Sequence, residues 1–142
     1  MIAIKIDKFG GPEVLKIEKV TLGKPGPEEV VIKHEAIGLN FIDTYHRSGL
    51  YPVELPSGIG AEASGIIEEI GSNVKDFTVG EHVAYSGAPL GAYSTKRIYP
   101  TKNLVKVPRE INLDIVATLM IKGLTTFYLL HKTYPVSSGE TV

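Results

Sequence analysis

The alternation of apolar and polar positions divides the chain into a strand-rich part, roughly the first hundred residues, and a helical final part. In the strand-rich part, short apolar runs are separated by turns containing Gly and Pro, a pattern typical of short strands. The runs that we expect to form strands are Met1–Asp7, Leu15–Val20, Val30–Leu39, Ile66–Ile70, His82–Tyr85, Tyr93–Tyr99 and Leu104–Val107. Several short strands at close spacing favour a barrel over an open sheet.

The pattern changes to a helical period after Asn112. Apolar residues recur at helical spacing over 115–120 and again over 124–131, and Asn112 is a suitable N-cap. Gly123, between the two stretches, predicts a kink or a join between two helices.

The last residues carry a separate signal. Ser137–Val142 has the pattern of a turn followed by the first residues of another strand. We therefore expect the chain to be a fragment of a longer protein.

Length and composition narrow the function classes. The chain has 142 residues, enough for one ordinary domain. Fifteen basic and sixteen acidic residues, with no basic run, disfavour a binder of nucleic acid or of a membrane surface. The absence of Cys excludes disulfides, a thiolate nucleophile and thiolate-bound metals. No window approaches the roughly 18 apolar residues of a membrane span, and we expect a cytoplasmic protein.

The glycine motif and the histidine spacing disfavour a dinucleotide-binding turn and a metal site in this chain. Gly58–Ala63 fits the dinucleotide-binding pattern G-x-G-x-x-G/A by letter, but a predicted strand, Ile66–Ile70, follows it instead of a helix. Without a helix N-terminus there is no array of free N–H groups for a pyrophosphate, so we interpret the motif as a turn. The histidines are His34, His46, His82 and His131, and no two of them have the spacing of a metal-binding pair.

The segment after the longest apolar strand combines polar and aromatic residues. Asn40 is a good helix cap and Asp43 would lie in the first turn, which gives both residues a structural explanation. Tyr45, Arg47 and Tyr51 follow closely, and a loop rich in Tyr with one Arg is also typical of the rim of a ligand site. Residue type alone favours the structural explanation.

Five segments, arranged in family order, resemble the zinc-free quinone oxidoreductases of the medium-chain dehydrogenase/reductase superfamily, and the resemblance extends over essentially the whole chain. They are Gly10–Leu15, Ala36–Pro52, Pro56–Gly65, Leu90–Ser94 and Lys122–Leu130. The resemblance implies a mainly β fold with C-terminal helices, a GroES-like, partly open β-barrel. Residues 1–142 would form its substrate-side catalytic domain. The C-terminal helices would lead toward a Rossmann domain that binds NADPH and is missing from this chain.

The same resemblance implies that the enzyme works without zinc. Asn40 stands where the zinc alcohol dehydrogenases of this superfamily usually have a Cys ligand, and Gly60-Ala61-Glu62 stands where they have G-H-E. A site without thiolate and imidazole cannot hold Zn²⁺. The implied reaction is the NADPH-dependent reduction of a quinone, which needs close approach of the two rings and donors for the negative charge on the quinone oxygen.

The family motif also implies the site residues. Catalytic roles are implied for Asn40, Asp43, Tyr45, Tyr51 and Thr125. Cofactor contacts are implied for Phe41, Ile42, Asp43, Thr44, Tyr45 and Tyr128. By residue pattern alone, Tyr128 fits ordinary packing on an apolar helix stripe. No metal is expected, and the partner is a small quinone. The full-length enzyme is expected to be a homodimer and this piece a monomer.

Two other functions stay open. An enoyl or alkenal reductase of the same superfamily would share the zinc-free barrel and differ in its substrate pocket. A stand-alone barrel without catalysis could act as a binding module.

Overall fold

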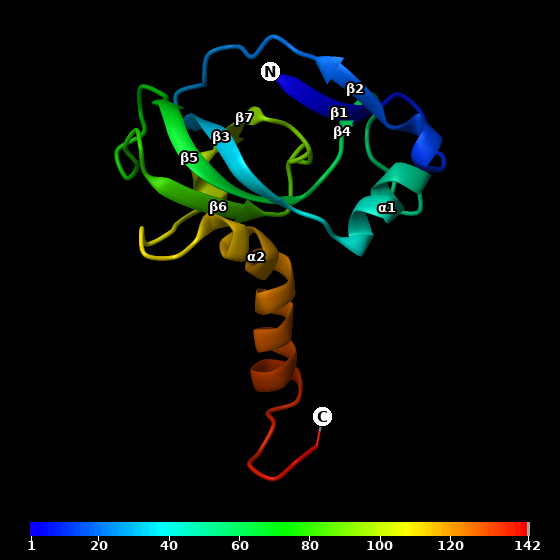
Figure 1. Ribbon diagram of the computed structural model, residues 1–142, viewed down its shortest axis with the longest axis vertical. Coiled ribbons are helices and arrows are strands. Elements are labelled where there is room, and N and C mark those ends of the chain that lie inside the picture. Colours follow the sequence, from blue (N-terminus) through cyan, green and yellow to red (C-terminus); the bar gives the residue numbers. More distant parts are fainter. Residues whose placement is uncertain (142) are drawn as a thin grey trace.

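Strands make up most of the regular structure, and one long helix projects from them (Figure 1). The computed structural model describes residues 1–141. Three strands form a small sheet in the order β2 (Lys16–Lys19), β1 (Ile2–Ile6) and β4 (Ser57–Gly58). Five strands form a larger sheet in the order β7 (Lys96–Pro100), β3 (Glu29–Gly38), β5 (Glu62–Ile70), β6 (His82–Ser86) and β8 (Leu104–Lys106). Neighbouring strands are antiparallel throughout.

Along the chain, the helical segments lie between strands and at the C-terminal end. The α-helices are α1 (Phe41–Ser48) and α2 (Leu113–Tyr128), and the shorter turns are the 3-10 segments η1 (Pro12–Val14) and η2 (Thr101–Asn103) and the π-helical η3 (Leu129–Thr133). Within residues 1–141 neither sheet closes on itself. The predicted mainly β, partly open architecture with C-terminal helices is therefore confirmed. The expectation from strand spacing alone, a barrel in preference to an open sheet, is wrong, because β7 and β8 stay at the two edges of the larger sheet.

The two sheets are joined by the segment before β7. The strand predicted over Tyr93–Tyr99 is divided, because its first residues leave the large sheet and pair with β1. The Ile4 N–H donates to the Tyr93 carbonyl (2.8 Å), and the Thr95 N–H donates to the Ile2 carbonyl (2.9 Å). This pairing brings Tyr93 to the boundary between the sheets, where the site described below is found.

Strand β5 is longer than its sequence pattern predicts. It begins at Glu62, four residues before the predicted Ile66–Ile70, so the predicted turn over Gly58–Ala63 is wrong at both ends: Gly58 belongs to β4 and Glu62 and Ala63 to β5. Glu62 is in strand register with Gly38 on β3 and Ser86 on β6, and this pairing on both sides extends the strand. A strand follows the glycine motif, as predicted, so the motif lacks the helix that a dinucleotide fingerprint requires.

Helix α2 starts at the predicted cap and continues through the predicted break. The Asn112 side chain accepts a hydrogen bond from the Asp114 N–H (2.8 Å), which confirms the N-cap. The join predicted at Gly123 is wrong, because one helix spans residues 113–128. An isolated glycine lowers the stability of a helix only modestly, so a glycine by itself does not end a helix.

The C-terminal turn is present as predicted. The Glu140 N–H donates to the Ser137 carbonyl at 3.2 Å. Val142, the last residue of the predicted strand start, lies outside the described residues.

The C-terminal helical segment contradicts one expectation. Leu113–Thr133 is long and apolar enough to cross a membrane by length and composition, with a mean hydropathy of 1.5 over 18 residues, of which 17% are buried. The expectation that no window approaches a membrane span is therefore wrong. The core helix of a soluble protein can have the same length and composition. Here the first turns are docked on the large sheet, where Leu113, Val116 and Ala117 are buried.

The apolar core of the large sheet contains one buried cation. Arg97 is 7% exposed and lies over the stacked rings of Tyr85 and Tyr99, with its guanidinium carbon 5.2 and 4.8 Å from their centroids. Its Nη2 donates to the carbonyls of Pro89 (2.9 Å) and Leu90 (3.1 Å). The buried arginine therefore fixes the loop that follows β6.

A chain of hydrogen bonds continues from Arg97 to His34. Arg97 Nη1 donates to the Tyr85 hydroxyl (3.3 Å), which donates to His34 Nε2 (2.9 Å), and His34 Nδ1 donates to the Ser94 carbonyl (2.6 Å). These directions need a neutral imidazole with its proton on Nδ1. Burial, opposed by the Ser94 bond and assisted by the Arg97 charge, lowers the pKa of His34 to about 4. Burial also raises the pKa of Tyr85 to about 12.

Gly38 lets α2 approach the large sheet. A Cβ added at Gly38 would overlap the Glu62 carboxylate and the backbone carbonyl of Ala117 on α2. Glu62 is fully buried and bonded, so neither neighbour can move away easily. By contrast, a Cβ at Gly123 would meet only Leu119, at an ordinary 3.5 Å.

We expect Gly38→Ala to lower the free energy of unfolding by about 1–3 kcal/mol, as overpacking does in well-packed interiors. Gly123→Ala is the matched control, and should raise the free energy of unfolding by about 0.5–1 kcal/mol through helix propensity. Urea unfolding of the two variants measures both values. Equal effects of the same sign would contradict the close approach at Gly38.

The buried neutral His34 predicts a pH-dependent stability. An unfolded histidine takes up a proton near pH 6.5, whereas folded His34 does so only near pH 4, so the unfolded state binds more protons between these values. Stability should therefore fall from pH 6.5 to pH 4, by on the order of 3 kcal/mol from this group.

Urea unfolding across that pH range should show a shallower fall in His34→Gln than in the wild-type chain. His131→Gln, at an exposed position near the C-terminus, serves as the control and should keep the wild-type slope. An unchanged slope in His34→Gln would mean that His34 is not the group responsible.

Candidate functional site

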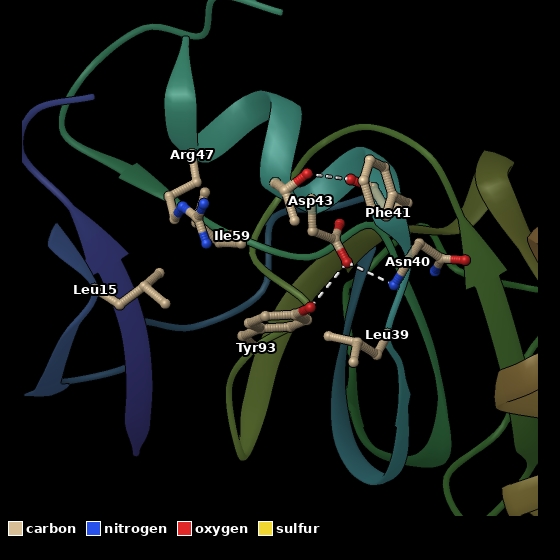
Figure 2. Close-up of a pocket in the computed structure, with 9 residues that line it drawn as sticks. Leu15, Leu39, Asn40, Phe41, Asp43, Arg47, Ile59 and Tyr93 are labelled. Atoms are coloured by element: carbon tan, nitrogen blue, oxygen red, sulfur yellow. Dashed lines mark hydrogen bonds between the residues drawn. The ribbon is translucent and has the colours of Figure 1, made fainter. Parts of the chain in front are cut away.

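The start of α1 separates two cavities that share Asn40 and Phe41. The smaller, here called the inner pocket, has a volume of about 270 Å³ (Figure 2). Its lining residues are Leu15, Leu39, Asn40, Phe41, Asp43, Thr44, Arg47, Ile59 and Tyr93. The larger, here called the helix cleft, has a volume of about 720 Å³. Its lining residues are Asn40, Phe41, Ile42, His46, Val53, Ala61, Ser86, Gly87, Ala88, Leu90, Met120, Ile121, Leu124 and Thr125.

Helix α1 begins at Asn40 because its first turn is closed from both directions. The Asp43 carboxylate accepts a hydrogen bond from the Asn40 backbone N–H (3.0 Å), and the Asp43 N–H donates to the Asn40 backbone carbonyl (3.0 Å). Gly49 ends the helix with a φ of 85°, a left-handed conformation that favours glycine. The side-chain amide of Asn40 is not used in these bonds and points elsewhere.

Asp43 fixes α1 against the junction of the two sheets. It is 4% exposed, and its Oδ2 accepts hydrogen bonds from the Tyr93 hydroxyl (2.8 Å) and the Asn40 N–H, as Figure 2 shows. Burial, together with the Asp43 carboxylate, raises the pKa of Tyr93 well above its usual value. Tyr93 therefore stays a neutral donor, and the pair holds one wall of the inner pocket.

The helix cleft is bounded by α1, by the loop after β6 and by one face of α2. The loop is held by Arg97, which binds the Pro89 and Leu90 carbonyls. On α2, Ile121 and Thr125 are one helical turn apart and both line the cleft. The cleft thus has mostly apolar walls with a few polar groups.

Glu62 joins the Asn40 amide to α2. Its side chain has no exposure to solvent. One carboxylate oxygen accepts a hydrogen bond from the Ile121 N–H (2.7 Å), and the other accepts from Asn40 Nδ2 (2.6 Å) and from Lys122 Nζ (3.3 Å). Lys122 Nζ also donates to Asn40 Oδ1 (2.9 Å). Both ends of the Asn40 amide are thereby occupied, so its orientation is fixed.

The structure brings most of the predicted site residues to these two cavities. Asn40 and Phe41 line both, Asp43 and Thr44 line the inner pocket, and Ile42 and Thr125 line the helix cleft.

The remaining predicted residues are the tyrosines. Tyr45 packs edge to face with Tyr51, at a centroid distance of 5.2 Å, and Phe41 packs on Tyr45 at 5.4 Å. Tyr128 is 60% exposed, one helical turn beyond the cleft residue Leu124. The roles of all these residues stay predictions.

Three residues of the site have no predicted role in the sequence. Glu62 lies in a predicted turn, Tyr93 in a predicted strand and Lys122 in one of the segments that carry the family resemblance. A usable signal existed for two of them. Glu62 is an acid among small residues that suit a buried strand, and Lys122 is a cation in an apolar helix, so each needs an oppositely charged partner.

The cavities differ in what they could hold. Among residues 1–141, no group of three His, Cys, Asp or Glu side chains comes together as metal ligands do. The helix cleft has the size and the mainly apolar lining of small-molecule sites. Its hydroxyl side chains, Ser86 and Thr125, lie among mainly apolar residues, an arrangement that fits a flat, weakly polar ring.

Comparison with known proteins identifies the family. The model of the alcohol dehydrogenase GroES-like domain matches residues 26–109. The chain is 50% identical over 140 residues to a quinone oxidoreductase of Pseudomonas aeruginosa, covering 98% of this chain and 43% of that protein. It is 48% identical over 148 residues to a 2-haloacrylate reductase of a Burkholderia species, covering all of this chain and 44% of that protein. The chain thus spans less than half the length of these relatives.

Solved structures agree with the sequence matches. The quinone oxidoreductase of Escherichia coli in complex with NADPH superposes with a TM-score of 0.92 at 43% identity, over 96% of this chain and 42% of that one. A 2-haloacrylate reductase superposes with a TM-score of 0.83 at 46% identity, over 96% of this chain and 41% of that one. The chain therefore belongs to the alcohol dehydrogenase GroES-like domain family, in the branch of the medium-chain dehydrogenase/reductases that contains the quinone oxidoreductases.

Proposed function

We propose that this chain is the substrate-side domain of an NADPH-dependent quinone oxidoreductase that works without zinc in a cytoplasmic location. The observation that carries the proposal is the helix cleft, which gathers Asn40, Phe41, Ile42 and Thr125 around one mainly apolar cavity. The E. coli relative that superposes over 96% of the chain was solved with NADPH. A cleft of this type can hold a flat cofactor ring against a flat substrate ring.

In this proposal the residues of the chain position and shield the reacting rings. Bound NADPH would supply the reducing equivalents. Phe41, Ile42 and Leu124 would exclude water, which strengthens the hydrogen bonds formed inside the cleft. The hydroxyl of Thr125 would donate to a ring substituent at the cleft. Asn40 would act through its position, because its amide already binds Glu62 and Lys122.

The tyrosines would complete the rim. Tyr45 and Tyr51 hold each other by edge-to-face contact, which limits the freedom of both hydroxyls. A positioned hydroxyl can donate to the quinone oxygen on which negative charge develops. Asp43 would hold α1, and with it Phe41 and Thr44, against Tyr93. Tyr128 would contact the cofactor from the distal half of α2.

A second, nucleotide-binding half would cover the exposed face of α2. The large apolar side chains exposed on this helix are Ile115, Leu119, Leu124, Phe127 and Tyr128. Relatives of which this chain spans less than half have further sequence that could cover this face. We propose that residues 1–142 are one domain of such a protein, that the whole protein is a homodimer and that this piece alone is a monomer.

The reduction of an activated alkene is the second candidate. The 2-haloacrylate reductase is 48% identical, nearly as similar as the P. aeruginosa quinone oxidoreductase. An enoyl or alkenal substrate needs the same close approach to the cofactor and a donor for its carbonyl oxygen. The same cleft serves both reactions, so the preferred substrate separates them.

The activity test uses this chain joined to the part of the P. aeruginosa quinone oxidoreductase that lies outside the match. We expect the fusion to oxidise NADPH with 1,4-benzoquinone faster than with 2-chloroacrylate or an enal, followed by NADPH absorbance. The isolated chain should bind NADPH weakly or not at all, because its glycine motif at 58–63 leads into strand β5 instead of a helix. Faster turnover of either alkene would transfer the assignment to the second candidate. A fusion that binds NADPH but reduces none of these substrates would favour a binding module.

Within the fusion, Thr125→Val should lower kcat/KM for the quinone by about tenfold, since a hydrogen bond to a developing charge is lost. Thr126→Val is the matched control, because its hydroxyl bonds the Lys122 carbonyl of its own helix and it does not line the cleft. The control should stay within about twofold of the wild type, as surface substitutions usually do. Equal losses in both variants would remove Thr125 from the site.

A further inference from the structure

We propose that Lys122, through Glu62, is a positioning residue that fixes the distance across the helix cleft. The inference rests on the function proposed above and names the contact that holds α2 at its place. Lys122 is not among the residues that line the cleft. Its effect on a bound ring would pass through Asn40 on one wall and through α2 on the other.

The Glu62 carboxylate is fully buried in the large sheet. A fully buried carboxylate is costly unless hydrogen bonds and an opposite charge compensate it. Glu62 accepts the Ile121 N–H, the Asn40 amide and the Lys122 ammonium, which are its three partners among the described residues. Lys122 is the one cation among these partners, although half of its side chain is exposed.

Glu62 holds the middle of α2. The Ile121 N–H, to which Glu62 is bonded, belongs to the middle of the helix, eight residues after its start at Leu113. Side chains four residues apart share one helix face, so the anchored turn presents Ile121 and Thr125 to the cleft together. Because Glu62 belongs to β5, the anchor sets the distance from the sheet to Thr125.

The Lys122 ammonium makes a second hydrogen bond, to the Asn40 side chain. Lys122 Nζ donates to Asn40 Oδ1 at 2.9 Å while Asn40 Nδ2 donates to Glu62 at 2.6 Å. The three side chains therefore form a closed ring of hydrogen bonds. Asn40 lines both cavities, so the same ring that holds α2 also fixes the opposite wall.

Near its N-terminus α2 has another polar anchor, so the role of Lys122 is confined to the middle and the distal half of the helix. The Ser64 hydroxyl donates to the Leu113 carbonyl at 2.7 Å, and Val116 and Ala117 are buried there. Beyond Lys122 the large side chains Leu124, Phe127 and Tyr128 are exposed. Loss of Lys122 should therefore leave α2 attached at its start and free its distal half.

The experiment compares three variants of the fusion enzyme and of the isolated chain. Lys122→Met removes the cation at similar length and leaves Glu62 uncompensated. Lys122→Arg keeps the charge. The double variant Glu62→Gln with Lys122→Met removes both charges and keeps a side-chain acceptor for the Ile121 N–H. Lys132→Met, a lysine further along the helical segment, is the matched control.

In the fusion, Lys122→Met should lower kcat for the quinone about tenfold, as small misplacements in a reacting pair do. Its melting temperature should fall as well. The double variant should recover the melting temperature, because no buried charge is left unpaired, but its kcat should stay low. Lys122→Arg should recover most of both values, and Lys132→Met should change neither. Recovery of kcat in the double variant would show that Lys122 acts only on stability and would overturn the proposal.

The isolated chain tests the anchor without any reaction. Amide hydrogen exchange of residues 121–125 should become about tenfold faster in Lys122→Met, while the amides of 113–117 should keep their protection. Unchanged exchange at 121–125 would overturn the proposal even if the fusion enzyme is active. A wild-type fusion without activity, combined with the expected change in exchange, would refute the proposed function and leave the anchor standing.

Discussion

The middle of α2 is attached to the large sheet through one buried carboxylate, Glu62. Glu62 sits in the middle of the larger sheet, between β3 and β6, where a carboxylate has no access to water. Its compensation comes from two parts of the chain: the Asn40 side-chain amide before α1, and the Ile121 N–H and the Lys122 ammonium of α2. Gly38 leaves the room that this arrangement needs. Sheet, α1 and α2 therefore meet at a single polar point, and the helix cleft lies beside it.

A second buried charge, Arg97, gives the cleft its other fixed wall. It connects the aromatic core to the loop after β6 and, through Tyr85, to a neutral His34 on β3. The loop carries no regular structure of its own, so these bonds determine where it lies. The two charges have opposite signs and separate partners, and both point their bonds at segments that line the cleft. A mainly apolar cavity is thus shaped by polar anchors behind its walls, which limits rearrangement when a ligand enters.

Local patterns predicted the elements of this fold well and their long-range partners poorly. The strands near β1, β3, β6 and β8, the cap at Asn112 and the helix after Asn40 follow from alternation and capping chemistry. The early start of β5 depends on pairing with two other strands, which its own glycine-rich sequence does not reveal. The predicted join at Gly123 is wrong because one isolated glycine lowers helix stability only modestly, and a single helix runs through it. Most predicted site residues lie at one of the two cavities, but Glu62 and Lys122, 60 positions apart, could be matched only in space.

The projecting helix also has a mechanical consequence. From Ile121 to its end at Tyr128, α2 extends about 10 Å, at about 1.5 Å per residue. Figure 1 shows this half of the helix projecting away from the strands. Ile121, where Glu62 binds the helix, also lines the helix cleft. A small sideways push at Tyr128 would be delivered to the turn that carries Thr125. A domain packed against the distal end of this helix would therefore influence the width of the helix cleft.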